Sequence, residues 1–269
     1  MSISVESKSN VGDLAGCIDT PDLYLTWAEA PWDSVIFGYP VLQISSIEVR
    51  SPGAVDAIVQ FELARDACGS KLVSCRMSHE RLRESMLLES IGFRFIEMTY
   101  HPELDELQTC NAFSGNGLKV ARAEPPDMPT VIAIAGVAFR NERFHVDPRL
   151  PSRLGDQRYQ NWVSSAISHP AQRLYVVRDG ASVIAFFVTE SLADGTCYWH
   201  LNAVAPEAQG QGYGKRAWHA MLGHAQSEGA RRVQTSIVAR NHRVLNLYAR
   251  LGFHFPSSMM TFHWVSAAQ

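Results

Sequence analysis

The sequence has few features of secreted, membrane-spanning or nucleic-acid-binding proteins. Its 269 residues carry a formal net charge of −3, and Lys and Arg form no block or stripe. Sequence-independent binding of nucleic acid relies on such blocks, so we expect no nucleic-acid partner. The first ten residues lack the apolar core of a signal peptide, and no apolar run approaches membrane-spanning length. We therefore expect no membrane segment.

Cysteine is scarce, and its pattern is not that of a binding site. The five cysteines are scattered and odd in number, and none forms a C-x-x-C pair or a Cys/His cluster. This pattern argues against a disulfide framework and a zinc site, and it favours a reduced, cytoplasmic setting. No carboxylate cluster accompanies the motifs described below, so we expect no metal. A hydrophobic content of 46% is sufficient for a folded core.

The most informative segment is rich in glycine. A β-prone run at 198–205 stops at Pro206, and glycines follow at 210, 212 and 214 before helical periodicity begins. Glycine lets the backbone approach a ligand closely, and the free N–H groups of a helix N-terminus attract anions. A strand, a glycine-rich turn and a helix start in this order predict a site for a phosphate-bearing ligand.

The spacing of this segment distinguishes between phosphate-binding motifs. It lacks the G-x-G-x-x-G of dinucleotide-binding folds, because the third glycine comes one residue early. It also lacks the nucleotide P-loop pattern, since Gln209 replaces the first glycine and Arg216 the Ser/Thr. The segment from Gln209 to Gly214 does match Q-x-x-G-x-G. An ordinary glycine-rich turn is the alternative.

A second motif lies downstream, at residues 241–253. Asn241 is a suitable helix N-cap, Val244 and Tyr248 fall on one helical face, and Gly252 stands where a glycine would end the helix. Residues 233–239 between the two motifs predict a strand. The second motif lies downstream of the first at about the distance that one helix and one strand require.

Together these motifs resemble the GCN5-related N-acetyltransferase (GNAT) superfamily. The glycine segment corresponds to its acyl-CoA pyrophosphate loop, and the second motif to N-x-x-A-x-x-x-Y-x-x-x-G-F, with Val244 in place of alanine. The resemblance implies an α/β fold with a mixed sheet flanked by helices, and acetyl-CoA as co-substrate. It also implies that the following residues bind the cofactor: Ala203, Val204, Gln209, Gly210, Gln211, Gly212, Tyr213, Gly214, Lys215 and Asn241.

The first half of the chain repeats part of the second. A strand at 71–77, Ser78 as a possible N-cap, and a helix with Leu82 and Met86 on its apolar face lead into residues 92–95, which resemble 252–255. Chance similarity of two amphipathic helices is the alternative. If the alignment holds, Leu88 replaces the tyrosine and no glycine loop precedes the unit.

We therefore expect a truncated GNAT-like domain at 1–125 and a complete catalytic domain at 130–269, divided within the Gly- and Pro-rich stretch 114–129. This organisation resembles that of the dTDP-fucosamine acetyltransferases, which act on nucleotide-linked 4-amino sugars. Residues 31–38 and 143–149 are similar to two further segments of that group.

Tyr248 is the expected general acid for the departing thiolate. A phenol pKa of about 10 and a thiol pKa of about 8.5 make proton transfer nearly balanced. A core aromatic is the alternative role. Ser236 stands where some relatives carry a glutamate base, which leaves His200 as the best-placed base and Glu190 as a weaker candidate. A structural histidine is the alternative for His200.

Four residues are expected to line the acceptor site, because a nucleotide sugar offers a diphosphate to Arg and flat faces to aromatic rings. They are Arg143, Asp147, Tyr159 and Trp199. Trp162 could join them, but packing of a helix at 153–167 suits it better.

The resulting hypothesis is direct transfer of acetyl from acetyl-CoA to a small-molecule amine, expected to be a nucleotide-linked 4-amino-deoxy sugar. The alternatives are another amine (an amino acid, an antibiotic or a protein N-terminus) and a non-catalytic acyl-CoA-binding protein. A homodimer is compatible with the sequence, which does not fix the oligomeric state.

Overall fold

The computed structural model describes residues 14–109, 113 and 117–266. The first ten residues, Cys110 and the start of the predicted 114–129 boundary lie outside these ranges. By its internal contacts the chain divides into two compact units, residues 1–97 with 259–269 and residues 98–258. Within the described ranges, the helices are all too short or too polar to cross a bilayer.

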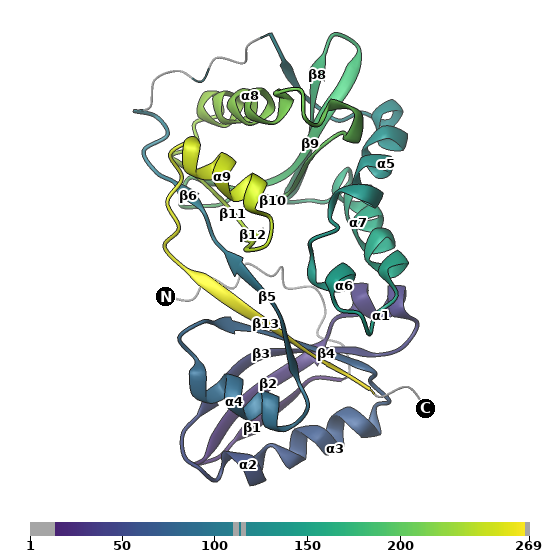
Figure 1. The fold of residues 1–269 in the computed structure, drawn as a ribbon, viewed down its shortest axis with the longest axis vertical. Helices are drawn as coiled ribbons and strands as arrows, with labels where there is room; N and C mark the ends of the chain where they lie inside the picture. Colours follow the sequence, from purple (N-terminus) through teal and green to yellow (C-terminus); the bar gives the residue numbers. More distant parts are fainter. Residues whose placement is uncertain (1–13, 110–112, 114–116, 267–269) are drawn as a thin grey trace. The chain divides into compact units, whose positions relative to one another are not determined.

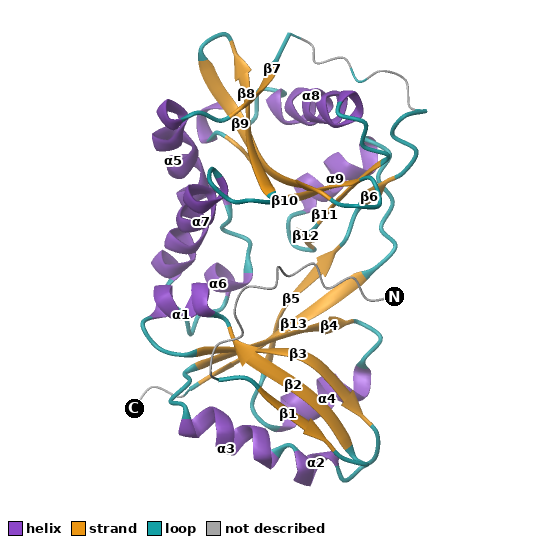
Figure 2. Ribbon diagram, turned by 180° about the vertical axis from the view of Figure 1, so that it is seen from behind, coloured by secondary structure: helices purple, strands orange, loops and turns teal. Residues whose placement is uncertain are grey.

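The N-terminal unit is a mixed sheet with helices packed against it (Figures 1 and 2). Its strands lie in the order β1-β2-β3-β4-β13-β5. The strands are β1 (Gly16–Asp19), β2 (Leu23–Glu29), β3 (Val41–Val49), β4 (Leu72–Ser78), β5 (Arg94–Tyr100, whose last residues belong to the second unit) and β13 (Ser258–Val265). The helices are α1 (Pro31–Phe37), α2 (Ala54–Ala57), α3 (Val59–Ala67) and α4 (Leu82–Ser90).

The second unit, residues 98–258, contains a six-stranded sheet in the order β6-β11-β10-β9-β8-β7. Helices α8 and α9 cover one face, and α5 and α7 cover the other (Figure 1). The strands are β6 (Glu103–Leu104), β7 (Lys119–Arg122), β8 (Gln172–Asp179), β9 (Ser182–Ser191), β10 (Thr196–Val204) and β11 (Arg232–Thr235), with β12 (Ile237–Val238) pairing elsewhere. The helices are η1 (Pro125–Asp127), α5 (Met128–Ala138), α6 (Arg143–Val146), α7 (Ser152–Ala166), η2 (Pro206–Ala208), α8 (Tyr213–Ser227) and α9 (His242–Arg250).

Helices α4 and α9 end in the same way, as the sequence repeat predicts. The N–H of Phe93 donates to the carbonyl of Leu88, and the N–H of Phe253 donates to the carbonyl of Tyr248, both at 3.0 Å. The preceding glycines, Gly92 and Gly252, share a φ of +89°. This pattern is a Schellman helix end, in which glycine takes the left-handed conformation. Leu88 therefore occupies in the first unit the place that Tyr248 occupies in the second.

The start of α4 differs from the prediction. Ser78 is not its N-cap, because the helix begins at Leu82 and the Ser78 hydroxyl instead accepts the N–H of Glu80. Leu82 and Met86 are 66% and 62% exposed. The helix instead contacts the core through Leu87 and Leu88.

The two units do not divide at 125–130 as expected. The last strand, β13, lies in the N-terminal unit, antiparallel to β4 from Met259 opposite Ser78 to Val265 opposite Leu72. Residues 119–122, within the predicted boundary, form β7 at the edge of the second sheet. Pairing of backbone groups between distant segments, rather than local composition, sets the division.

The predicted strand at 233–239 is two short strands with different partners. β11 lies parallel to β10 and antiparallel to β6. β12 pairs with Thr99 and Tyr100 at the end of β5. Ser236 stands at the break between them.

Candidate active site

A β-bulge in β10 changes which way its side chains face. The register with β9 shifts between Trp199 and Leu201, so that His200 is the extra residue. Trp199, before the bulge, belongs to the core beneath α8 and α9, whereas Leu201 and Ala203, after it, belong to the core beneath α5 and α7. Since side chains alternate along a strand, Asn202 then faces the α8 and α9 side.

Beyond the bulge, β10 has one edge without a paired strand. Its parallel pairing with β11 ends at Trp199 opposite Thr235, and β12 pairs with β5 instead. Within the described residues, positions 201–204 pair only with β9. Backbone groups along such an edge can hydrogen-bond an extended ligand. Ala203 and Val204, which the resemblance predicts to bind the cofactor, lie on this edge.

The glycine loop follows directly and is exposed. Gly210 and Gly212 both have a φ of +80°, a conformation that favours glycine. A Cβ built on Gly210, Gly212 or Gly214 would meet no atom within 4 Å. The loop therefore leads into the N-terminus of α8 with open space at its backbone, which is the arrangement required for an anion.

Side chains around the loop hold its shape and add positive charge. The Gln209 side-chain amide donates to the Val204 carbonyl at 3.2 Å, and that of Gln211 donates to the Glu207 carbonyl at 2.6 Å. The Tyr213 hydroxyl donates to the Asp179 carboxylate at 2.8 Å, which ties the start of α8 to the end of β8. Lys215 is exposed on the first turn of α8.

Tyr248 lies in α9 with its side chain in the core of the same face. It is 1% exposed and its ring lies against Phe253, with centroids 4.9 Å apart. Its hydroxyl donates to Asn202 Oδ1 at 3.4 Å, immediately beyond the bulge. Burial raises the pKa of the Tyr248 phenol, and polar neighbours that include Thr235 and Asn202 oppose this shift. The phenol therefore keeps its proton at neutral pH.

Asn241 caps α9, as predicted. Its Oδ1 accepts the N–H of Val244 at 3.3 Å, which satisfies one of the free donors of the first turn. The contact with CoA that the resemblance implies for this residue stays a prediction.

His200 and Glu190 form a close pair on the opposite face from Tyr248. His200 Nε2 lies 2.9 Å from Glu190 Oε2 across β10 and β9. Burial lowers the pKa of His200, while Glu190 opposes the shift. The imidazole is therefore neutral at pH 7 and can accept a proton. Sequence reasoning named both residues but did not predict their contact.

The expected acceptor-site residues come from two places in the second unit: Arg143, Asp147 and Tyr159 from α6, its C-cap and α7, and Trp199 from β10. Asp147 is buried and accepts a bidentate ion pair from Arg149, at 2.8 and 2.9 Å. Tyr159 is buried and stacks on Phe139, with centroids 4.4 Å apart. Arg143, at the start of α6, lies over the ring of Phe144.

Trp199 is fully enclosed, at 0% exposure, between Phe187 and Phe253. This burial is a correction to the expected acceptor site, because stacking on an acceptor needs an exposed ring face, whereas the role expected of Tyr248 needs only its hydroxyl. Trp162 is half-buried on α7, as expected for helix packing, and its indole N–H donates to Gln172 Oε1 at 3.2 Å.

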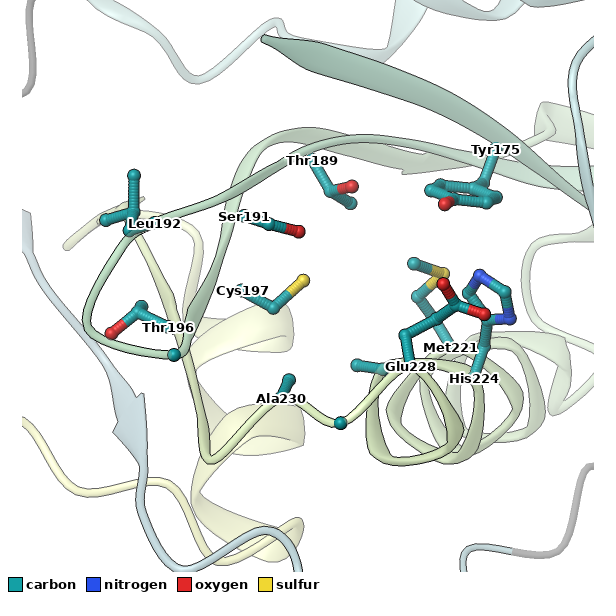
Figure 3. A pocket seen from close by; sticks show the side chains of 13 residues that line it. Tyr175, Thr189, Ser191, Leu192, Thr196, Cys197, Met221, His224, Glu228 and Ala230 are labelled. Carbon is teal, nitrogen blue, oxygen red and sulfur yellow. The ribbon is translucent and has the colours of Figure 1, made fainter.

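A separate cavity of about 130 Å³ lies near the C-terminal end of α8, away from the glycine loop (Figure 3). Cys197 points toward it from β10, and His224 and Glu228 do so from α8 and the following turn (Figure 3). Burial raises the pKa of the Cys197 thiol to about 11. This thiol is therefore protonated at neutral pH and unsuited to act as a nucleophile.

One group of residues in the described ranges has the donor atoms for a metal ion. Glu103, Asp105 and His254 bring one ligand atom each to within 4.8 Å of one another. Asp105 and His254 are exposed, and Asp105 also lies 3.7 Å from the Arg232 guanidinium. These features are equally those of a surface ion-pair cluster.

Comparison with known proteins agrees with this geometry. Residues 135–253, from the last turn of α5 to just past the end of α9, match the acetyltransferase (GNAT) family. A GNAT N-acetyltransferase from Sphaerobacter thermophilus shares the fold, with a TM-score of 0.62, 16% identity, and coverage of 92% of this chain and 82% of that one. The chain therefore carries a GNAT acetyltransferase domain and is an acetyl-CoA-dependent acyltransferase.

Two further relatives extend over both units. A tandem GNAT protein from the clavulanic acid biosynthesis pathway has a TM-score of 0.55 at 15% identity, covering 92% of this chain and 80% of that one. The spore coat polysaccharide biosynthesis protein SpsD of Bacillus subtilis is 24% identical over 256 residues, which are 89% of this chain and 82% of that protein.

Proposed function

We propose that this protein transfers acetyl from acetyl-CoA to the amine of a nucleotide-linked 4-amino-deoxy sugar. The observation that carries the proposal is the open edge of β10, which runs from Asn202, at the Tyr248 hydroxyl, to the exposed glycine loop. A CoA molecule would bind its diphosphate at Gly210–Gly214 and extend its thioester arm along this edge toward Tyr248.

The sugar acceptor is supported by two observations. The similarity to SpsD extends over most of both chains, and that protein is named for polysaccharide biosynthesis. The sequence also resembles the dTDP-fucosamine acetyltransferases at residues 31–38 and 143–149. A cytoplasmic location fits this role, because acetyl-CoA and nucleotide sugars are cytoplasmic metabolites.

The reaction proceeds by direct attack. The neutral amine nitrogen bonds to the thioester carbonyl carbon, the C–S bond breaks, and the sulfur takes a proton from Tyr248. The nitrogen then loses one proton, which restores the Tyr248 phenol. A backbone N–H on the open edge would stabilise the developing oxyanion, a contribution of roughly 3 kcal/mol to the barrier.

The Tyr248→Phe variant tests the role of the phenol. We expect CoA to bind with unchanged affinity, whereas kcat with acetyl-CoA and a dTDP-linked 4-amino-4,6-dideoxy sugar falls about 10²-fold, within the range for general acids. Release of the CoA thiol measures turnover, and calorimetry measures binding. Tyr175→Phe is the matched control, because Tyr175 is a half-buried tyrosine beside His224, outside the proposed site.

Unchanged turnover of Tyr248→Phe would remove this residue from the mechanism. Amino acids and aminoglycosides, tested in parallel, address the alternative acceptors. A wild-type protein that binds CoA but acetylates nothing in the panel would favour the non-catalytic alternative.

A further inference from the structure

The His200–Glu190 pair is built into the sheet. The two side chains come from adjacent strands and are only 10% and 21% exposed. A carboxylate can only accept hydrogen bonds, so His200 Nε2 carries the hydrogen in the 2.9 Å contact. In the neutral ring, Nδ1 is then the nitrogen with the available lone pair. Glu190 thus determines which imidazole nitrogen can accept a proton.

Neighbouring side chains hold the imidazole in place. The Tyr198 ring lies 4.8 Å from it in an edge-on arrangement, and the Trp162 ring lies 6.1 Å from it. Trp162 is itself held by Gln172, which stands opposite Glu190 in the register of β8 and β9. Such restraint differs from an exposed ion pair, whose long side chains remain free to separate.

We propose that Glu190 is a positioning residue that makes His200 the proton acceptor for the ammonium group of the acceptor substrate. This inference rests on the acetyl transfer proposed above. The ammonium gives one proton to His200 Nδ1 and becomes a neutral amine, and Glu190 stabilises the imidazolium. After attack, the nitrogen passes its second proton to the Tyr248 phenolate, which restores the phenol that protonated the sulfur. His200 then releases its proton to solvent.

The bulge explains how both groups can serve one reaction. His200 lies on the α7 side of β10, whereas Tyr248 reaches Asn202 from the α9 side. The unpaired edge at 200–204 lies between them. An amine at this edge could meet the base from one face and the thioester from the other.

Three titratable groups of the described residues surround His200, and one charged group packs on its neighbour Trp162. Glu190 faces it from β9, Tyr198 from β10 and His169 from the loop before β8. The Arg158 guanidinium, on α7, lies over the Trp162 ring, 5.3 Å from its centroid. Burial lowers the pKa of His200, His169 lowers it further, and Glu190 opposes both. Removing the Glu190 charge should therefore lower this pKa.

The test compares Glu190→Gln with the wild type in kcat/KM from pH 5 to 9, using acetyl-CoA and the dTDP-linked 4-amino-4,6-dideoxy sugar. We expect the acidic limb of the Glu190→Gln profile to move to lower pH and kcat/KM at pH 7 to fall about tenfold. The kcat/KM profile of His200→Gln should show no acidic limb. NMR of ¹⁵N-histidine-labelled protein, with His200 assigned from His200→Gln, should show the Nε2–H tautomer in the wild type.

Glu103→Gln is the matched control, because its carboxylate lies 3.9 Å from another histidine, His254, and its profile should not change. If Glu190→Gln transfers acetyl with the same acidic limb of kcat/KM as the wild type, this inference is overturned and the proposed function is not. An Nδ1–H tautomer of His200 in the wild type would also overturn the inference. Absence of acetyl transfer by the wild type would instead overturn the proposed function, and this inference with it.

Discussion

Replacing Gly212 with alanine separates the conformational cost of the glycine loop from its role in binding. Gly212 is the N-cap of α8 and has a φ of +80°. Gly229, just past the C-terminus of the same helix, has a φ of +84°. A Cβ at either position would meet no atom within 4 Å, so the strain in both variants comes from the backbone alone.

The two variants should lose similar stability. An alanine in the left-handed region costs about 1–2 kcal/mol, and we expect both variants to lose this much unfolding free energy in urea. Only Gly212→Ala should weaken CoA binding, because its methyl group occupies the space through which a diphosphate reaches the loop amides. A loss of about 1.4 kcal/mol or more corresponds to at least a tenfold rise in Kd, measured by calorimetry.

Two results would refute this reasoning. Equal CoA affinity of Gly212→Ala and Gly229→Ala would show that the loop backbone does not approach the ligand. A loss of stability confined to Gly212→Ala would show that the loop is strained for a reason other than its φ angle.

Two further predictions concern stability. Asn241→Ala should lower the unfolding free energy, measured in urea, by about 1 kcal/mol, whereas Asn241→Ser should lose less, since serine also caps helices. Equal losses in the two variants would show that the Asn241 cap does not stabilise the protein. Because burial lowers the pKa of His200, the unfolded chain binds more protons below pH about 6.5, so the unfolding free energy should fall as the pH drops through this region. His200→Gln should reduce this dependence of the unfolding free energy on pH. An unchanged dependence would contradict the contribution assigned to His200.

Local signals predicted the parts of the fold that depend on neighbouring residues. The end of β10, the glycine turn, the start of α8 and the Asn241 cap all lie where the sequence places them. Each depends on backbone conformation or on hydrogen bonds between residues a few positions apart. The repeat also predicted the shared ends of α4 and α9.

The bulge at His200 could not be predicted in this way. Apolar residues recur at every second position from Cys197 to Ala203, which predicts a regular strand with one core-facing side. Instead, Trp199 and Leu201 lie in different cores. Nothing local marks the extra residue, and the contacts that depend on it, such as Tyr248 with Asn202, were missed.

Long-range strand pairing was equally hidden from the sequence. β13 pairs with β4 across most of the chain, so the Gly- and Pro-rich stretch at 114–129 does not separate the units. The burial of Trp199 was hidden as well, because it depends on contacts with Phe187 and Phe253, which are distant in the sequence.

A crystal structure of the protein with bound CoA tests the central claim most directly. We predict that the diphosphate contacts the backbone amides of Gly210 to Gly214 and that the sulfur lies within hydrogen-bonding reach of the Tyr248 hydroxyl. A CoA molecule bound elsewhere, or a sulfur far from Tyr248, would contradict the proposed site and mechanism.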